Sequence, residues 1–231
     1  MSQPANNKRP LITLTNSKSP VSEAYRSLRT SIDFSSIDER MQVIAVTSAG
    51  PGEGKSTTIG NLAIAYAQSE RRTLLIDADL RKPTEHHTFN VSNRWGLSSV
   101  LSQQSELADV IQNSSSVPNL SIITSGPIPP NPAEMLASKR MSALIDQLRG
   151  QYDVILIDTP PLLAVTDAQV LAAKCDGYIL VLDQGKVKKD IAIKAKGNLE
   201  KVGARILGVV LNNVKRKKSE GYYYYYYGES K

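Results

Sequence analysis

The sequence predicts an α/β fold in which helices cover both faces of a doubly wound, mostly parallel β-sheet. Apolar runs of strand length alternate with helical stretches along most of the chain, an order that is typical of parallel sheets. The strand runs are apolar throughout, as in "VILI" at residues 154–157, which is the pattern of strands buried on both faces. With 231 residues, 41% of them hydrophobic, the chain is long enough to build this sheet as one domain.

The first regular element is expected to be a helix that begins at Ser22. In "SEAYRSLRTSIDF" three apolar residues, Ala24, Leu28 and Ile32, recur at near-helical spacing. The apolar runs that follow predict strands at residues 42–48, 73–79, 120–126, 153–158, 177–183 and 205–212. Helices are expected between them, near residues 55–69, 167–174 and 188–201.

A further helix is expected in "PNPAEML". Asn131 can cap this helix, and Pro132 suits its first position because proline has no N–H to leave unpaired. Glu134 stands where a capping box requires an acidic residue.

The chain is expected to divide into three parts. Residues 1–20 form an extended lead, residues 21–214 a single domain, and residues 215–231 a flexible, tyrosine-rich tail. The N-terminus has no apolar signal-peptide core, and no apolar run approaches the ~18 residues of a membrane span, so a cytoplasmic protein is expected. One cysteine, Cys175, excludes an internal disulfide and fits a reducing compartment.

The net charge of +6 is unevenly distributed. Basic clusters stand at "KVKK", "KAK" and above all "KRKK", residues 215–218. Such clusters can bind nucleic acid, anionic lipid or an acidic partner, or can form an ordinary solvated surface. Charge alone does not choose among these.

Residues 49–56, "AGPGEGKS", match the phosphate-binding pattern G-x-x-x-x-G-K-[ST] except that Ala49 replaces the first glycine. A predicted strand precedes the motif and a predicted helix follows it, which is the context that the pattern requires. Glycines let backbone N–H groups turn toward an anion, and the start of the helix adds its positive dipole end. The motif predicts nucleotide binding in a P-loop NTPase-like fold.

The residues expected to contact the nucleotide are Gly50, Pro51, Gly52, Glu53, Gly54, Lys55, Ser56 and Thr57. Lys55 can reach the β- and γ-phosphates, and the Ser56 hydroxyl can be a ligand of Mg²⁺. Asn212, at the end of the last strand, either reads the edge of the adenine or satisfies local backbone groups; the sequence favours neither.

Three aspartates follow predicted strands. Asp158 ends "VILID" and has the position of a Walker B acid. Asp77 and Asp79 end the strand after the P-loop helix, and their i, i+2 spacing places both carboxylates on one side of an extended segment. Two like charges so close need Mg²⁺ or a basic side chain to compensate them. Arg81 and Lys82 follow at once, so structural ion pairing is the alternative to a site.

In these motifs the sequence resembles the bacterial tyrosine kinases of capsule and exopolysaccharide systems, and the resemblance extends over nearly its whole length. "AGPGEGKST", "LLIDADLRKP" and "VILIDTPP" are similar to that family's Walker A, A′ and B motifs. "SPVSEAYRSLRTSI", "TSGPIPPNP" and the tyrosine-rich C-terminus are similar as well. The related MinD/ParA ATPases typically carry a signature lysine near the start of the P-loop, where this chain has Gly50.

The resemblance implies an ATP- and Mg²⁺-dependent protein-tyrosine kinase that phosphorylates its own C-terminal tyrosines in trans, and thereby regulates polysaccharide synthesis or export. The acceptors would be Tyr222, Tyr223, Tyr224, Tyr225, Tyr226 and Tyr227. Lys55, Asp77, Asp79 and Asp158 would be the catalytic residues. Asp77 would accept the phenol proton late, because tyrosine titrates near ~10 and aspartate near ~4, while Ser56, Asp79 and Asp158 would face the metal. The roles of the three aspartates can be exchanged.

The resemblance also implies partners. An E-x-x-R-x-x-R motif, here Glu23, Arg26 and Arg29, would lie at the subunit interface of a ring octamer. A transmembrane adaptor of the polysaccharide co-polymerase type would activate the chain and recruit it to the inner face of the membrane. A phosphotyrosine phosphatase and exogenous tyrosine substrates are further partners; nucleic acid is not an expected one.

Two other functions are alternatives to this one. A MinD/ParA-like ATPase switch would bind membrane or DNA through "KRKK". A structural protein would use the tyrosines as adhesive contacts, since an uncharged tyrosine-rich window is prone to β-aggregation.

Overall fold

The structure is a computed structural model that describes residues 9–35 and 41–214. These residues form a seven-stranded sheet in the order β3-β4-β2-β5-β1-β6-β7. All neighbours are parallel except β3, which runs antiparallel to β4. The strands are β1 Val43–Ser48, β2 Thr73–Asp77, β3 Ile111–Asn113, β4 Leu120–Ile123, β5 Val154–Asp158, β6 Gly177–Asp183 and β7 Ile206–Asn212.

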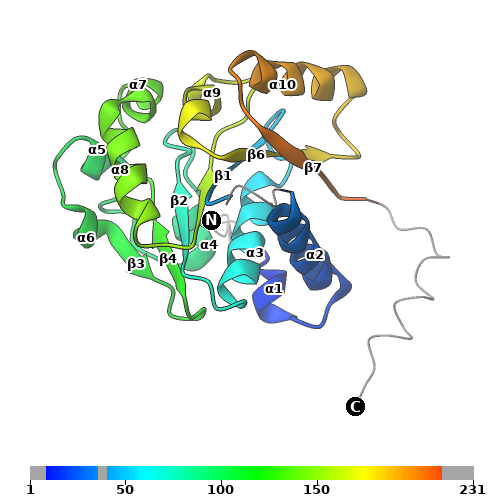
Figure 1. Cartoon of the computed structure of the whole chain (residues 1–231), viewed down its shortest axis with the longest axis horizontal. Helices are drawn as coiled ribbons and strands as arrows, with labels where there is room; N and C mark the ends of the chain where they lie inside the picture. The colour runs from blue at the N-terminus through cyan, green and yellow to red at the C-terminus, as the bar shows by residue number, and fades with distance from the viewer. Residues whose placement is uncertain (1–8, 36–40, 215–231) are drawn as a thin grey trace, which may run out of the picture.

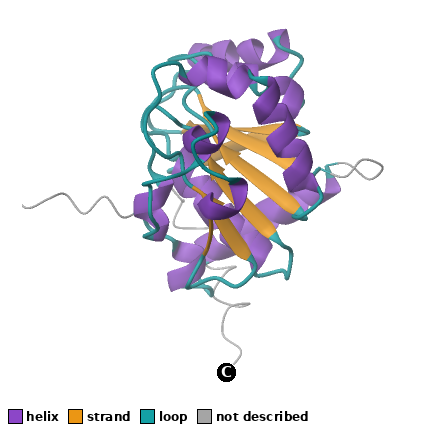
Figure 2. Cartoon of the chain, turned by 90° about the vertical axis from the view of Figure 1, so that its left-hand side faces the viewer, coloured by secondary structure: helices purple, strands orange, loops and turns teal. Residues whose placement is uncertain are grey.

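Helices cover both faces of this sheet, as Figures 1 and 2 show. They are α1 Ile12–Thr15, α2 Pro20–Phe34, α3 Lys55–Ala67, α4 Glu85–Phe89, α5 Leu97–Leu101, α6 Leu107–Val110, α7 Pro132–Ala137, α8 Lys139–Arg149, α9 Asp167–Val170 and α10 Lys189–Lys201. On one face α3 buries Ile59 and Leu62, and α2 buries Ile32. On the other face α8 and α10 bury Leu144 and Leu199. The predicted doubly wound α/β fold is confirmed.

The N-terminal region differs from the prediction in two respects. Helix α2 begins at Pro20, not Ser22, because Ser19 caps it by accepting a hydrogen bond from Ser22 N (3.0 Å). The lead is not wholly extended, since α1 lies within it. The side chain of Asn61 on α3 holds α1 in place: its Oδ1 accepts from Thr13 N (2.9 Å) and its Nδ2 donates to Pro10 O (3.0 Å).

Further corrections concern element ends. Strands β2 and β4 end earlier than predicted, at Asp77 and Ile123, because the chain turns into the loops that follow. Asn131 does not cap the backbone of α7; its Nδ2 donates to Glu134 Oε2 instead (2.7 Å). The helix predicted at 167–174 is split into α9 and a 3₁₀ turn, Ala172–Lys174.

The edge strand β7 is not buried on both faces as its apolar sequence predicted. Val209 and Leu211 are 51% and 56% exposed, whereas every residue of β1, β2, β5 and β6 is buried. An edge strand has a neighbour on one side only, and β7 has exposed residues on both of its faces, Gly208 and Val209 among them. An apolar run therefore does not by itself establish a central strand.

Asp176, which directly precedes β6, connects that strand to the start of β1 and to the end of α8. Its carboxylate accepts hydrogen bonds from Gln42 N (2.9 Å) and Val43 N (2.7 Å), where β1 begins. Arg149, at the end of α8, donates to both oxygens at 2.6 and 2.9 Å. Burial favours the neutral acid, but the guanidinium and the two amides outweigh it and hold the pKa of Asp176 below its ordinary value.

We expect Asp176→Asn to lower the free energy of unfolding by about 1–3 kcal/mol at pH 7, because charge-assisted hydrogen bonds are lost. Since the folded-state pKa is depressed, the stabilisation is present above the unfolded pKa near ~4 and is lost as the pH falls through the folded value. Urea unfolding at pH 7 and at lower pH measures both effects. The matched control is Asp146→Asn, an exposed position on α8; equal loss in both variants would contradict the role of Asp176.

Candidate active site

The predicted site residues meet at the carboxyl edge of the sheet centre. Asp77 and Asp158 are register partners at the ends of β2 and β5, and the phosphate-binding loop connects neighbouring β1 to α3. Ligands of open α/β sheets bind at this edge. The three motifs, far apart in sequence, are therefore brought together as predicted.

Two glycines give the loop its shape. Gly52 and Gly54 have φ of 75° and 89°, the left-handed region that glycine occupies without strain. A Cβ on Gly54 would also overlap the side-chain amide of Asn212. The side chain of Glu53 turns back into the loop, is 4% exposed and accepts from Gly50 N, so Glu53 can meet a ligand only through its backbone in this conformation.

Lys55, the first residue of α3, points its ammonium into a group of oxygens. Its Nζ lies 3.1 Å from Asp79 Oδ2, 3.3 Å from Asp158 Oδ1 and 3.1 Å from Ser56 Oγ. Burial opposes the positive charge, but the carboxylates of Asp158, Asp79 and Asp77 outweigh burial and raise the pKa of Lys55. Lys55 is therefore a charged group held between two strand ends.

Asp77 is fully buried and oriented by backbone amides. Oδ1 accepts from Asp79 N (3.2 Å), and Oδ2 accepts from Thr84 N (2.9 Å) and Glu85 N (3.0 Å). Burial and the charge of Asp158 raise its pKa to about 7. An ionised carboxylate offers about four acceptor positions, so one remains for a further proton or donor.

Ion pairing with Arg81 and Lys82, the alternative explanation for Asp77 and Asp79, is found only in part. Arg81 pairs with Asp167, which is buried, through two bonds of 2.9 Å, and not with Asp77 or Asp79. Lys82 contributes its backbone amide, which donates to Asp79 Oδ1 (3.0 Å). The positive partner of Asp79 is Lys55, which the sequence reasoning assigned to phosphates alone.

Glu85, at the start of α4, is a buried acid that the sequence analysis missed. It is 0% exposed, and neither carboxylate oxygen has a hydrogen-bond partner among the described residues. Burial, together with the charges of Asp158 and Asp77, raises its pKa well above the ordinary value. No pattern in "KPTEHH" marks this residue, because its burial arises from the fold of the loop after β2.

Oxygen donors suitable for Mg²⁺ converge around Lys55 Nζ. Ser56 Oγ and the carboxylates of Asp79 and Asp158 surround this cation, and oxygen is the ligand type that Mg²⁺ prefers. Within the described ranges, no three His, Cys, Asp or Glu side chains are arranged to hold a metal by themselves. The donor set thus fits an ion that keeps waters or phosphate oxygens in its shell.

The side chain of Asn212 contacts local backbone groups in this structure. Its Nδ2 donates to Glu53 O (3.1 Å), and its Oδ1 accepts from Asn213 N (3.0 Å). Both ends of the amide are thereby engaged, and the end of β7 is joined to the phosphate-binding loop.

The three residues of the E-x-x-R-x-x-R motif lie on α2 and contact their own chain. Arg26 pairs with Glu23 at 2.8 Å and donates to Ser17 O at 2.7 Å. Arg29 donates to Ala65 O near the end of α3 (2.9 Å).

The predicted tail and its acceptors, Tyr222–Tyr227, lie outside the described residues. In the part of the chain that the structure describes, no helix is long and apolar enough to cross a bilayer.

Comparison with known proteins places this geometry in a family. A family model described as "AAA domain" matches residues 41–187. The tyrosine-protein kinase YwqD of Bacillus subtilis (strain 168) is 48% identical over 211 residues, which cover 91% of this chain and 89% of that protein. The putative tyrosine-protein kinase CapB of Staphylococcus aureus is 41% identical over 205 residues, 89% of this chain and 90% of that protein.

Solved structures agree. The crystal structure of the chimerical protein CapA2B2 is 41% identical and has a TM-score of 0.86, covering 94% of this chain and 93% of that one. The septum site-determining protein MinD of Pyrococcus horikoshii OT3, complexed with Mg-ADP, is 27% identical with a TM-score of 0.64, covering 77% and 72%. The chain is thus more similar to the kinases than to MinD, and the resemblance stated from the motifs is confirmed. This chain belongs to the bacterial tyrosine-protein kinase family.

Proposed function

We propose that this kinase transfers the γ-phosphoryl group of ATP to its own C-terminal tyrosines, in trans within a homo-oligomer. The observation that carries the proposal is the position of Lys55 Nζ, which lies between Ser56, Asp79 two residues beyond β2, and Asp158 at the end of β5. A phosphate-binding lysine beside acidic strand ends is the arrangement that phosphoryl transfer uses. Relatives over most of the chain are named tyrosine-protein kinases.

In this proposal the backbone amides of residues 50–57 and the ammonium of Lys55 bind the phosphates of ATP. Ser56, Asp79 and Asp158 would hold Mg²⁺, which when bound neutralises charge on the phosphate oxygens. The Mg-ADP complex of MinD, a fold neighbour, supports both ligands. The Lys55 ammonium leaves the carboxylates to reach a phosphate.

The proposed reaction forms a bond between a tyrosine oxygen and the γ-phosphorus and breaks the bond from that phosphorus to the β–γ bridging oxygen. ADP leaves, and the phenol proton passes to a carboxylate, for which we propose Asp77. Burial and the charge of Asp158 raise the pKa of Asp77, which brings it closer to the pKa of a tyrosine near ~10. Transfer late in the reaction is therefore less costly than an ordinary aspartate would make it.

The tail can reach a site from where the described chain ends. Asn213 donates to Asp183 Oδ2 (2.9 Å) at the carboxyl edge of the sheet, the edge that bears the phosphate-binding loop. From Asn213 to Tyr222 the chain spans at most about 30 Å when extended. That length permits a site on a neighbouring subunit.

We further propose the setting that the family resemblance implies. A transmembrane adaptor activates the kinase and holds it at the inner face of the membrane. A phosphatase removes the phosphates, and the cycle regulates capsule or exopolysaccharide synthesis or export. The alternative of a MinD/ParA-like switch is supported only by the weaker structural similarity and the basic "KRKK".

Lys55→Met is expected to abolish phosphate incorporation, because the variant loses the positive charge that binds the phosphates. Mass spectrometry after incubation with Mg·ATP measures the incorporation on tyrosine. Lys174→Met, a lysine whose Nζ donates to Ala137 O away from the loop, is the control and should remain labelled. Label on the Lys55→Met protein equal to wild type would overturn the proposed function.

Replacement of all six tail tyrosines by phenylalanine is expected to remove most of the label and to leave ATP affinity unchanged, because the acceptors are lost and the nucleotide site is not. Phosphate mapping and equilibrium ATP binding make the two measurements. Full labelling of this variant would place the acceptors elsewhere in the chain.

The homo-oligomer, a ring octamer by resemblance, is proposed to form through α2. Glu23→Ala combined with Arg26→Ala is then expected to sediment more slowly than wild type, because a charged contact between subunits is lost. Ser27→Ala, an exposed change on the same helix, serves as control. Sedimentation velocity distinguishes the species, and an unchanged profile for the double variant would count against this interface.

A further inference from the structure

Two loops at the carboxyl edge of the sheet expose apolar side chains beside the candidate active site. The first loop, residues 92–96, carries Trp95, the one tryptophan of the chain, which is 41% exposed. The second, "PIPP" at residues 127–130, carries Ile128, which is 65% exposed and follows the exposed Pro127. Where exposed apolar side chains gather in one place, they mark a site that binds another molecule.

Hydrogen bonds hold the two loops together. The side chain of Asn93 accepts from Gly126 N (2.9 Å) and donates to Gly126 O (3.2 Å). Gly96 lies so close to Gly126 that a Cβ on Gly96 would overlap its backbone N. Trp95 and Ile128 are each within two residues of these contacts and therefore belong to one surface. We call the exposed residues of this surface the Trp95 surface: Arg94, Trp95, Pro127 and Ile128.

The Trp95 surface lies one strand away from Asp77. Strands β2 and β4 are parallel neighbours, and their register pairs Ile76 with Ile123. The backbones of the next residues, Asp77 and Thr124, are therefore about 5 Å apart. Thr124 Oγ1 in turn donates to Trp95 O (3.3 Å). A peptide with one residue at Asp77 thus reaches the Trp95 surface within a few residues.

The tyrosine run of the tail, Tyr222–Tyr227, suits this separation. In an extended peptide, residues two apart point to the same side and lie roughly 7 Å from each other. Each of the six tyrosines has another tyrosine two positions away in at least one direction. When one tyrosine lies at the acidic strand ends, a second can therefore stack on Trp95, and aromatic pairs attract each other beyond the area that they bury.

Charge favours the same occupant. Glu220 and Glu229 flank the tyrosine run, each two residues from its end. The Trp95 surface carries the exposed Arg94, whose guanidinium lies 6.0 Å from the centre of the Trp95 ring. A cation beside an aromatic ring is complementary to a tyrosine-rich segment with acidic ends.

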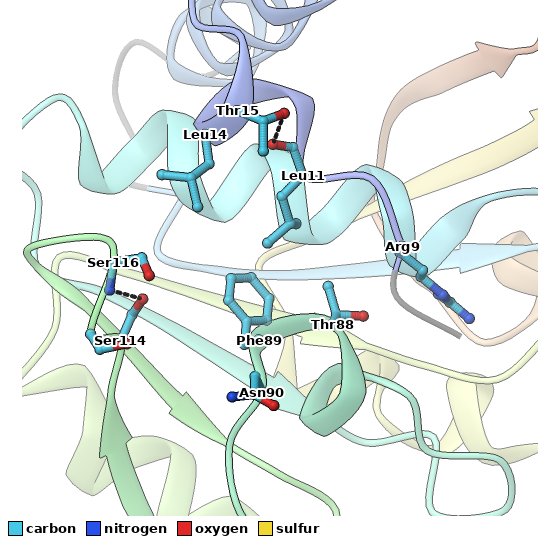
Figure 3. Close-up of a pocket in the computed structure, with 10 residues that line it drawn as sticks. Arg9, Leu11, Leu14, Thr15, Thr88, Phe89, Asn90, Ser114 and Ser116 are labelled. Atoms are coloured by element: carbon cyan, nitrogen blue, oxygen red, sulfur yellow. Dashed lines mark hydrogen bonds between the residues drawn. The ribbon is translucent and has the colours of Figure 1, made fainter. Parts of the chain in front are cut away.

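The pocket of Figure 3 does not have these properties. It has a volume of about 300 Å³ and is lined from α1, the end of α4 and residues 114–116, with Leu11, Leu14 and Phe89 among its walls. None of its lining residues belongs to the phosphate-binding loop or to the ends of β2 and β5. A tyrosine bound in this pocket would not be held at Asp77.

We propose that the Trp95 surface is an acceptor subsite, which binds one tyrosine of the tail while another lies at Asp77. This inference rests on the proposed function, because it names the surface that holds the acceptor of that reaction. Trp95 and Ile128 position the acceptor and take no part in the chemical step. The run of six tyrosines then supplies several registers in which one ring is bound and another reacts.

The first test measures binding. A peptide of residues 219–230 is titrated into the full chain with all six tail tyrosines replaced by serine, so that its own tail does not compete. Because Trp95 is the one tryptophan, its fluorescence, excited where tyrosine does not absorb, reports the contact. We expect a saturable change with this peptide and none with a peptide whose six tyrosines are serines.

Variants locate the binding. Ile128→Ser is expected to weaken binding of the tyrosine peptide about tenfold. Ile193→Ser removes an isoleucine that is 59% exposed on α10 and should leave the affinity unchanged. An absent fluorescence change, or equal affinity of the Ile128→Ser and Ile193→Ser proteins, would overturn the subsite.

The second test separates acceptor binding from chemistry. The acceptor is the full chain with Lys55→Met, which keeps its tyrosines, and the enzyme is the chain with the serine tail. Trp95→Ala in the enzyme is expected to raise KM for the acceptor about tenfold and to change kcat by less than about twofold, because binding alone is weakened. Trp95→Phe, which keeps an aromatic ring, should restore most of the loss. A decrease confined to kcat would contradict a positioning role.

The outcomes separate the two proposals. If wild type labels its tyrosines but Trp95→Ala and Ile128→Ser leave KM unchanged, the subsite is wrong and the proposed function stands. If wild type incorporates no phosphate while the peptide still binds at Trp95, the proposed function fails and the docking of the tail stands. Circular dichroism checks the fold of each variant, and Ile128→Ser replaces Trp95→Ala in the kinetic test if the latter does not fold.

Discussion

The ammonium of Lys55 among buried carboxylates is the interaction on which the carboxyl edge of this sheet depends. Asp77 and Asp158 are fully buried and Asp79 is nearly so, and buried charges persist only when they are paired or hydrogen-bonded. Lys55 contacts Asp79 and Asp158 directly, while three backbone amides serve Asp77. The positive charge of one side chain thus compensates the negative charges of carboxylates that come from different parts of the sequence.

The same interaction constrains nucleotide binding. The N–H donors of the Lys55 ammonium that bond to the carboxylates cannot at the same time bond to a phosphate group. When it turns to phosphate, Asp79 and Asp158 lose a partner, and breaking a buried ion pair costs about 3–5 kcal/mol. That cost is avoided only if another cation or a proton takes its place. Burial raises the pKa of Asp77, Asp158 and Glu85 above the ordinary values of these acids, so burial already disfavours unpaired negative charge in this cluster.

The sequence predicted the fold class and the meeting of the three motifs because both depend on local patterns. Apolar runs mark the central strands, and parallel strands bring their carboxyl ends to one edge. Helix α8 was not predicted, although its sequence carries a signal for it. Four apolar residues recur at helical spacing after the N-cap Ser138: Met141, Leu144, Ile145 and Leu148. The exposure of β7, the burial of Glu85 and the pairing of Arg81 with Asp167 were not predictable in this way. Each depends on which elements pack beside them, and no local pattern records that.

Helix α2 lines a groove beside the phosphate-binding loop and also carries the E-x-x-R-x-x-R motif. Its Val21, Ala24 and Leu28 line the groove beside the phosphate-binding loop, and its Glu23, Arg26 and Arg29 lie on neighbouring positions of the same helix. Arg29 also bonds to α3 at Ala65 O, and α3 begins at Lys55. A contact that shifts α2 against α3 would therefore change the shape of the groove and the position of the loop together. If subunits associate through α2, assembly and nucleotide affinity are linked through this helix, and linkage requires that each affect the other equally.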